Sequence, residues 1–228
     1  MDQKLRNEIQ ILVNNYKYGD FKKVLSKCSS LVKKYPKNDF LWNLTGLSFQ
    51  RIGNQENAVT SFKNAIDHNP KNNSAKNNLG ISYKVMRRYS EAEKIFSELL
   101  IDNPNYVNAI INLANLKKDT YFLDEATSYY KKALSIDENL PELHLNISSI
   151  LQVKNKMDEA KAHLFKALKL KNNFTEADQT LSMLLDYKNE DSSDHLSSML
   201  DKIKDSRLVD NDKILLNFAL GKAFEDKK

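Results

Sequence analysis

Residues 73–106 read NSAKNNLGISYKVMRRYSEAEKIFSELLIDNPNY, and the size pattern of this 34-residue stretch recurs from residue 39 to residue 172. Counted from residue 73, a glycine stands at position 8, an alanine at position 20 and an aromatic residue at position 24. The equivalent residues of the four units are Gly46, Ala58 and Phe62, then Gly80, Ala92 and Phe96, then Ala114, Ala126 and Tyr130, and at positions 20 and 24 of the last unit Ala160 and Leu164. Four consecutive units in one phase predict a structural repeat.

The period and the sizes of these residues resemble the tetratricopeptide repeat (TPR) family. The resemblance implies an all-α fold, a TPR superhelix (α-solenoid) of antiparallel helix pairs, in which the first helices of the units line a concave groove. Small residues at positions 8 and 20 let the two helices of a unit approach, and bulky residues at positions 11 and 24 fill the space around them. Neither helix can bury its apolar stripe alone, so the units must stack.

The repeat frame divides the chain into four parts. Residues 39–172 form four clear TPR units, and residues 1–38 form a degenerate N-terminal helix pair, as a unit without a preceding neighbour can. Residues 173–188 continue the frame as a capping helix. Residues 189–228 are interpreted as a linker and C-terminal helices, a truncated connector to a downstream domain being one interpretation.

Within this frame several residues have predicted local roles. Ile11 and Cys28 take positions 7 and 24 of the degenerate pair, where a repeat buries its residues, so we expect both to be packed. Leu12 stands at position 8, where the later units have a small residue. The predicted N-caps of later second helices, whose side-chain oxygens can accept from unpaired N–H groups, are Ser90, Asp124 and Asp158.

Composition limits the function classes. The chain has 228 residues with 41% apolar content, only 5 Gly and 4 Pro, and no apolar run of membrane-spanning length or signal-peptide type. We therefore expect a cytoplasmic protein that does not contact membranes. The formal charge of +5 comes from 35 basic and 30 acidic residues that are interleaved along the chain. Nucleic-acid binders concentrate basic charge on one face, so a nucleic-acid partner is disfavoured.

Neither enzyme activity nor a cofactor or metal is expected. The histidines His68, His144, His163 and His195 are scattered and lack metal-ligand spacing, and the glycines are too isolated for a phosphate-binding loop. His144 falls on position 4, a packing position, which predicts an imidazole in the core or at the edge of the groove.

Three asparagines stand out as groove candidates: Asn78, Asn112 and Asn146 all occupy position 6 of their units. They are similar to the asparagine ladder of O-GlcNAc transferase, and the resemblance implies amides that hold the backbone of an extended peptide in the groove. A carboxamide suits this role because it offers donors and an acceptor. The alternative is composition, since the chain is rich in Asn throughout. The carboxylate clamp of chaperone-binding TPR proteins is disfavoured, because Ser74 and Asn78 stand where that family has Lys and Arg.

The C-terminal segment carries a second resemblance. Residues 218–223, FALGKA, are similar to the connector of bacterial TPR-containing sulfotransferases, which lies before a catalytic domain that uses the donor PAPS. The first four residues of this string, FALG, also fit positions 5–8 of an ordinary repeat, so the alternative of a degenerate TPR helix stays open. The helix has an apolar stripe of Leu215, Leu216, Phe218, Ala219 and Phe224. Solenoids normally end with a polar outer face, so the stripe predicts a partner: a downstream domain, another copy of the chain or a separate protein.

The sequence thus predicts a scaffold that binds a protein or peptide in the groove of its first helices. The alternative is the N-terminal TPR region of a PAPS-dependent sulfotransferase whose catalytic domain is absent from this chain.

Overall fold

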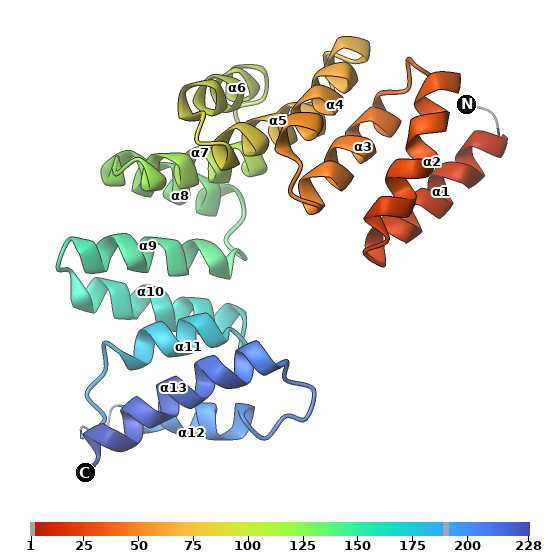
Figure 1. Ribbon diagram of the computed structural model, residues 1–228. Coiled ribbons are helices and arrows are strands. Elements are labelled where there is room, and N and C mark those ends of the chain that lie inside the picture. The colour runs from red at the N-terminus through yellow and green to blue at the C-terminus, as the bar shows by residue number, and fades with distance from the viewer. Residues whose placement is uncertain (1–2, 189–191) are drawn as a thin grey trace. The chain divides into compact units, whose positions relative to one another are not determined.

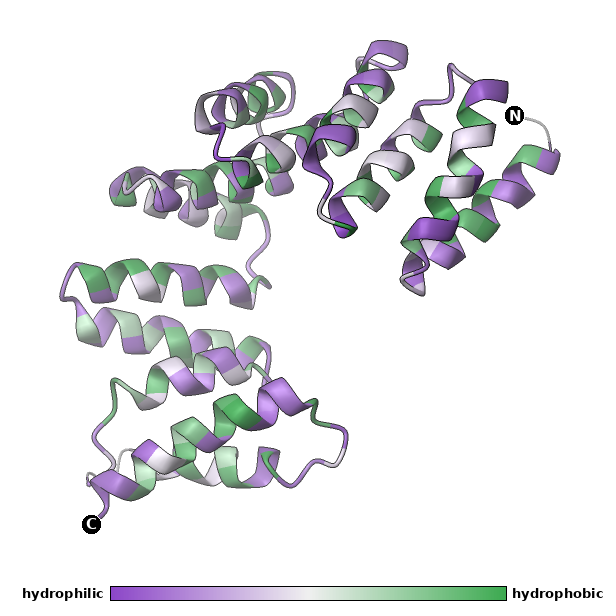
Figure 2. Cartoon of the chain, viewed as in Figure 1, coloured by the Kyte–Doolittle hydropathy of each residue, from purple (hydrophilic) through white to green (hydrophobic). Residues whose placement is uncertain are grey.

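The computed structural model describes residues 3–188 and 192–228, and these residues fold into α-helices that follow one another in antiparallel pairs (Figure 1). The predicted all-α fold is therefore confirmed. Contacts divide the chain into two compact units, Met1–Tyr129 and Tyr130–Lys228, which we name the N-terminal body and the C-terminal body. Polar and apolar residues share most helices, so that each helix has one face to bury (Figure 2).

The N-terminal body is built of consecutive helix pairs. Its helices are α1 (Gln3–Lys17), α2 (Phe21–Lys34), α3 (Asp39–Arg51), α4 (Gln55–His68), α5 (Asn73–Val85), α6 (Tyr89–Asp102), α7 (Val107–Asp119) and the first half of α8 (Leu123–Ile136). The second helices α2, α4 and α6 each contact both their own first helix and the first helix of the next pair, as α4 does with α3 and α5. The helices α3, α5 and α7 begin at residues 39, 73 and 107, which is the phase predicted from the repeat.

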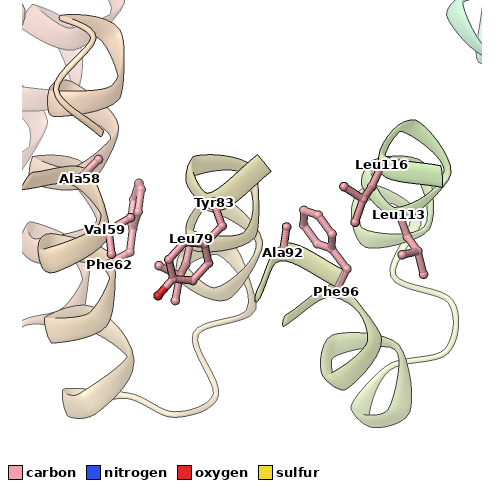
Figure 3. Close-up of a cluster of buried hydrophobic side chains, with 9 residues drawn as sticks. All are labelled: Ala58, Val59, Phe62, Leu79, Tyr83, Ala92, Phe96, Leu113 and Leu116. Atoms are coloured by element: carbon pink, nitrogen blue, oxygen red, sulfur yellow. The ribbon is translucent and has the colours of Figure 1, made fainter. Parts of the chain in front are cut away.

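Position 8 marks the closest approach of two helices. A Cβ atom on Gly46 would lie 2.5 Å from the ring of Phe62, and one on Gly80 would lie 2.5 Å from the ring of Phe96. Both rings are fully buried in the cluster of Figure 3, to which α4, α5, α6 and α7 contribute. The predicted small residues at position 20 are also fully buried, namely Ala58, Ala92, Ala126 and Ala160.

Asparagine side chains cap three helices of this body. The Oδ1 atoms of Asn38, Asn54 and Asn72 accept hydrogen bonds of 3.0, 3.1 and 2.9 Å from backbone N–H groups in the first turns of α3, α4 and α5. Each bond satisfies a donor that would otherwise have no partner within the helix. Part of the asparagine content thus serves capping.

The N-caps predicted at Ser90, Asp124 and Asp158 are wrong. Their helices α6, α8 and α10 begin one residue earlier, so these residues lie inside the first turn. The turns before them are closed by the backbone, because the N–H groups of residues 88, 122 and 156 donate to carbonyls of the preceding helix at 2.9, 2.8 and 2.9 Å. The helices α6 and α10 therefore begin at once, without a side-chain cap.

The first helix pair departs from the predicted register. Cys28 of α2 is fully buried as predicted, as is Val24 in the same helix, and burial raises the pKa of the Cys28 thiol. In α1, however, Leu12 is buried with 1% of its surface accessible, whereas Ile11 is 58% exposed, so the prediction of a packed Ile11 is wrong. Leu12 stands at position 8, where later units have a small residue. Its large side chain is part of the core in place of that of Ile11.

The C-terminal body continues the helix pairs and ends in a small cluster of helices. Its helices are the second half of α8, then α9 (Pro141–Val153), α10 (Met157–Leu170), α11 (Thr175–Ser182), α12 (Ser193–Lys202) and α13 (Asp210–Asp226). Pro141 opens α9, where its missing N–H costs no hydrogen bond. The helix α13 packs on both α11 and α12. The helix predicted within residues 173–188 ends already at Ser182, and residues 189–191 of the predicted linker lie outside the described residues.

Candidate functional site

The first helices α3, α5 and α7 form a row in the N-terminal body, in which α5 contacts both of its neighbours. This row carries two of the three asparagines predicted as groove residues. We define the first-helix row as the candidate site and build it from its polar contacts.

Amide pairs join the helices of the first-helix row. The Nδ2 atom of Asn78 in α5 donates to Oδ1 of Asn43 in α3 at 3.1 Å, and Nδ2 of Asn112 in α7 donates to Oδ1 of Asn77 in α5 at 2.9 Å. In each pair the acceptor residue is at position 5 of one unit and the donor residue at position 6 of the next. The acceptors have 9% and 7% of their surface accessible, whereas the donors are half-buried. The geometry thus repeats from one unit to the next.

The amide pairs explain the local choice of residue. A buried amide without a hydrogen bond costs about 1–3 kcal/mol, so the buried Asn43 and Asn77 need a partner on the neighbouring helix. Asn78 and Asn112 provide it with one N–H group each, and the pair fixes the orientation of both carboxamides. Side chains held in this way lose less freedom when they bind a ligand.

The structure places the predicted asparagines differently from one another. Asn78 and Asn112 occupy equivalent places on the first-helix row, but they are half-buried and each is bonded to another amide, which was not predicted from the sequence. Asn146 lies on α9 in the C-terminal body, and it is half-buried too. The residue at position 5 of the unit before it is Ile111, so the sequence does not repeat the amide acceptor there.

Another polar bridge on the first-helix row was not predicted. Gln50 in α3 donates from Nε2 to Oγ of Ser82 at 2.8 Å and to the backbone carbonyl of Asn78 at 3.1 Å. The two residues lie 32 positions apart in the sequence, at positions 12 and 10 of successive units. Only comparison of successive units in the correct register could have paired them.

The last turns of α5 and α7 carry three lysines, Lys84, Lys117 and Lys118, against one carboxylate, that of Asp119. The ammonium group of Lys84 lies 2.9 Å from the carboxylate of Asp119. Lys118, which precedes Asp119 in the sequence, is partly buried, and this burial lowers the pKa of its ammonium group. The carboxylate of Asp119 raises this pKa, and the charge of Lys84 lowers it further. The first-helix row therefore combines oriented amides with cations at one end, a surface suited to polar chains that include a negative charge.

The C-terminal body brings together two histidines that the sequence left scattered. The Nδ1 atoms of His144 in α9 and His163 in α10 lie 2.9 Å apart, so one imidazole donates and the other accepts. Burial, His144 and Lys166, in this order, lower the pKa of His163 to about 4. His144 has 8% of its surface accessible, which confirms the predicted packing position.

A buried polar network joins α11 to α12. The carboxylate of Asp178 accepts two hydrogen bonds of 2.8 Å from the ammonium group of Lys202 and lies 3.1 Å from Nε2 of His195. The hydroxyl of Tyr187 lies 2.6 Å from Nδ1 of the same imidazole. If Nε2 of His195 carries the proton, it donates to Asp178, and Nδ1 accepts from the hydroxyl of Tyr187, so each side chain of the network has a hydrogen-bond partner. Burial raises the pKa of this hydroxyl. All four residues have 7% or less of their surface accessible, so the network is part of the packed interior of the C-terminal body.

Neither polar cluster of the C-terminal body was predicted. The paired residues are separated by 19 positions for the histidines and by 24 for Asp178 and Lys202, spacings that match no local motif. Among the described residues, no three histidine, cysteine or acidic side chains are grouped so that they could hold a metal ion. In the same residues, no helix is both long and apolar enough to cross a membrane.

Comparison with known proteins places the chain among repeat proteins. The profile of the tetratricopeptide repeat matches residues 107–140 and 141–174, which are the third and fourth units of the predicted phase. No curated protein matches the chain.

Among solved structures, PilF of Pseudomonas aeruginosa is 16% identical with a TM-score of 0.72, and the match covers 92% of this chain and 94% of PilF. Yeast Tom70 is 17% identical with a TM-score of 0.71, with 89% of this chain and 43% of Tom70 covered. MamA from Desulfovibrio magneticus RS-1, residues 41 to the end, is 17% identical with a TM-score of 0.65, with 76% and 98% covered.

These matches show that the fold is that of TPR proteins. They give no support to the resemblance between the C-terminal segment and the connector of bacterial TPR-containing sulfotransferases.

Proposed function

We propose that this chain is a scaffold without catalytic activity that binds an extended segment of another protein across the first-helix row of its N-terminal body. The observation that carries the proposal is the repeated amide geometry of Asn78 and Asn112. TPR structures in general present such rows to protein ligands, and the fold of this chain is of that kind.

The amides have the chemistry that a peptide backbone requires. Each donor asparagine uses one of its two N–H groups in the amide pair, and within the described residues its second N–H and its Oδ1 have no further hydrogen bond. One N–H donor and one carbonyl acceptor are what a peptide unit pairs with, whatever its side chain. Because the amide pairs already fix the orientation, binding loses little side-chain entropy.

The lysines add a preference for charge. Lys84 and Lys118 lie in the last turns of α5 and α7, beyond the asparagines along the same helices. A segment that places an acidic residue at this end would gain a favourable interaction, which salt should weaken because the site is partly exposed. The proposed ligand is therefore an extended segment with an acidic residue at one end.

A selected peptide can test the role of the amides. Peptides selected for binding to the full chain should bind the Asn78→Ala/Asn112→Ala variant about tenfold more weakly or worse, since two ligand contacts of roughly 0.5–1.5 kcal/mol each are removed. The matched control is Asn105→Ala/Asn211→Ala, which removes two exposed asparagines outside the first-helix row. Titration calorimetry measures both, and circular dichroism checks that the helices persist. Equal affinity of the two variants would refute the proposal.

Asn146 requires a separate measurement, because it belongs to the C-terminal body. Replacing it with Ala in the double variant reproduces the complete predicted set of three. A further loss of affinity would show that the bound segment reaches α9, and an unchanged affinity would restrict the site to the N-terminal body.

A further inference from the structure

The last helix, α13, has two apolar faces. One face is buried against the rest of the C-terminal body through Leu216, Ala219, Leu220 and Ala223. The other carries Ile214, Phe218 and Phe224, which are 53%, 66% and 49% exposed. At 3.6 residues per turn these three side chains lie on one side of the helix, with Gly221 between them. We name this side the α13 stripe.

Gly221 forms a gap in the α13 stripe. A Cβ atom on this residue would meet nothing within 4 Å in the described chain, so no intramolecular contact requires a glycine. A glycine in the middle of a helix is about 1 kcal/mol less favourable than an alanine. The same chain shows what helical glycines of this kind accommodate, because Gly46 and Gly80 are each covered by an aromatic ring of the antiparallel helix that follows.

The sequence around Gly221 shares two features with that around Gly80. Both glycines follow a leucine, and Phe224 and Tyr83 are the aromatic residues three positions further on. Phe96 fills the space over Gly80, whereas the space over Gly221 is open. The α13 stripe therefore has the form of the first helix of a repeat whose second helix is supplied from elsewhere.

We propose that a second copy of this chain supplies that helix, and that two α13 helices pack antiparallel with Phe218 of each copy over Gly221 of the other. An antiparallel pair has a two-fold axis, so a register that covers one glycine also covers the other. The same register places Ile214 beside Phe224 of the second copy, which buries the remaining apolar residues. Each α13 helix thus supplies both the Phe218 ring and the open space over Gly221, and the small Gly221 allows the two helices to approach closely.

Charge complementarity supports the antiparallel arrangement. Asp210 begins α13 with its side chain 99% exposed and 3.7 Å from the ammonium group of Lys213, and Lys228 follows the end of the helix in an exposed position. In the proposed register Asp210 of one copy lies near Lys228 of the other, at both ends of the pair. A parallel pair would bring like charges together instead, which costs free energy.

Sedimentation velocity of the full chain over a range of protein concentrations tests the proposal. We expect a reversible monomer–dimer equilibrium whose dissociation constant rises about tenfold or more in Gly221→Gln, where a long side chain blocks the gap. Glutamine is a better helix former than glycine, so misfolding cannot explain a loss of dimer. Phe218→Ser should weaken the dimer as well. The control is Val153→Ser, which removes a 72% exposed side chain of α9.

A cysteine cross-link tests the register. Ile214 and Glu225 of opposite copies face each other in the proposed pair, so a mixture of Ile214→Cys and Glu225→Cys chains should form a mixed disulfide under mild oxidation. The native Cys28 is buried and should not interfere. A chain that stays monomeric at all concentrations, a dimer that Gly221→Gln leaves unchanged, or cross-links that form in each single variant but not in the mixture would overturn the proposal.

Discussion

The two bodies of this protein differ in the buried polar groups that join their helices, although exposed ion pairs such as Lys84–Asp119 occur in the N-terminal body as well. In the N-terminal body, neutral amides and a hydroxyl bridge the first helices, as Asn78 does with Asn43 and Gln50 with Ser82. In the C-terminal body, titratable groups carry the contacts, as His163 does with His144 and Lys202 with Asp178. Neutral contacts keep their strength over a wide pH range, whereas charged and titratable contacts depend on protonation and are costly to leave unpaired. The bodies should therefore respond differently to mutation and to acid.

The largest effect is expected for Asp178 in the C-terminal body. In Asp178→Asn the buried ammonium group of Lys202 loses its counter-charge, and removal of one partner of a buried ion pair typically costs about 3–5 kcal/mol. Urea unfolding followed by circular dichroism measures the loss. Asp158→Asn is the matched control, because that side chain is 98% exposed and its pairing with Lys161 contributes little. A loss below about 1 kcal/mol would show that Lys202 finds another partner or water.

The next prediction compares two helical glycines, one from each body. Gly80→Ala should destabilise the protein by about 1–3 kcal/mol, because the new methyl group would lie 2.5 Å from the buried Phe96 ring and the core must shift. Gly221→Ala meets open space and should instead stabilise α13 by up to about 1 kcal/mol.

Denaturant titration at low protein concentration, where a dimer would dissociate, compares the two glycine variants. Effects of the same sign would contradict the steric interpretation of position 8.

Much of the fold could be predicted from the sequence because residue size repeats with the structure. The glycines and alanines at positions 8 and 20 mark helix contacts within one repeat, and these contacts depend on local packing. The exchange between Ile11 and Leu12 was missed because the first pair has no preceding unit to fix its register.

The polar contacts were harder to predict. The amide pairs join position 6 of one unit to position 5 of the previous one, so finding them requires the register and the rotation of neighbouring helices. The histidine pair and the Asp178 network are not repeated in other units, and no periodic signal points to them. Sequence reasoning placed Asn78 and Asn112 on the correct helices, but it could not show that each is bonded to another asparagine.

Near neutral pH the smallest effect is expected from the titration of His163. Its pKa is lowered to about 4 in the folded chain, whereas an unfolded chain has a histidine pKa near 6.5. As the pH falls below about 6.5 the unfolded state takes up a proton that the folded state does not bind until about pH 4. Stability should therefore decrease as the pH falls through this window, by at most about 1.4 kcal/mol per pH unit for one proton. His144, whose pKa burial also lowers, acts in the same direction.

The substitution His163→Gln isolates this contribution. A glutamine can still hydrogen-bond to His144 but does not titrate, so the slope of unfolding free energy against pH between 4 and 6.5 should become smaller than in the native chain. Carboxylates also contribute to the slope of unfolding free energy against pH in both chains. The quantity to measure is therefore the difference between the slopes of the native chain and the variant. The Asn43–Asn78 pair of the N-terminal body offers the control, since Asn78→Ala removes a neutral contact and should lower stability by the same amount at every pH. If both substitutions changed the slope equally, the contrast between a neutral and a titratable body would be wrong.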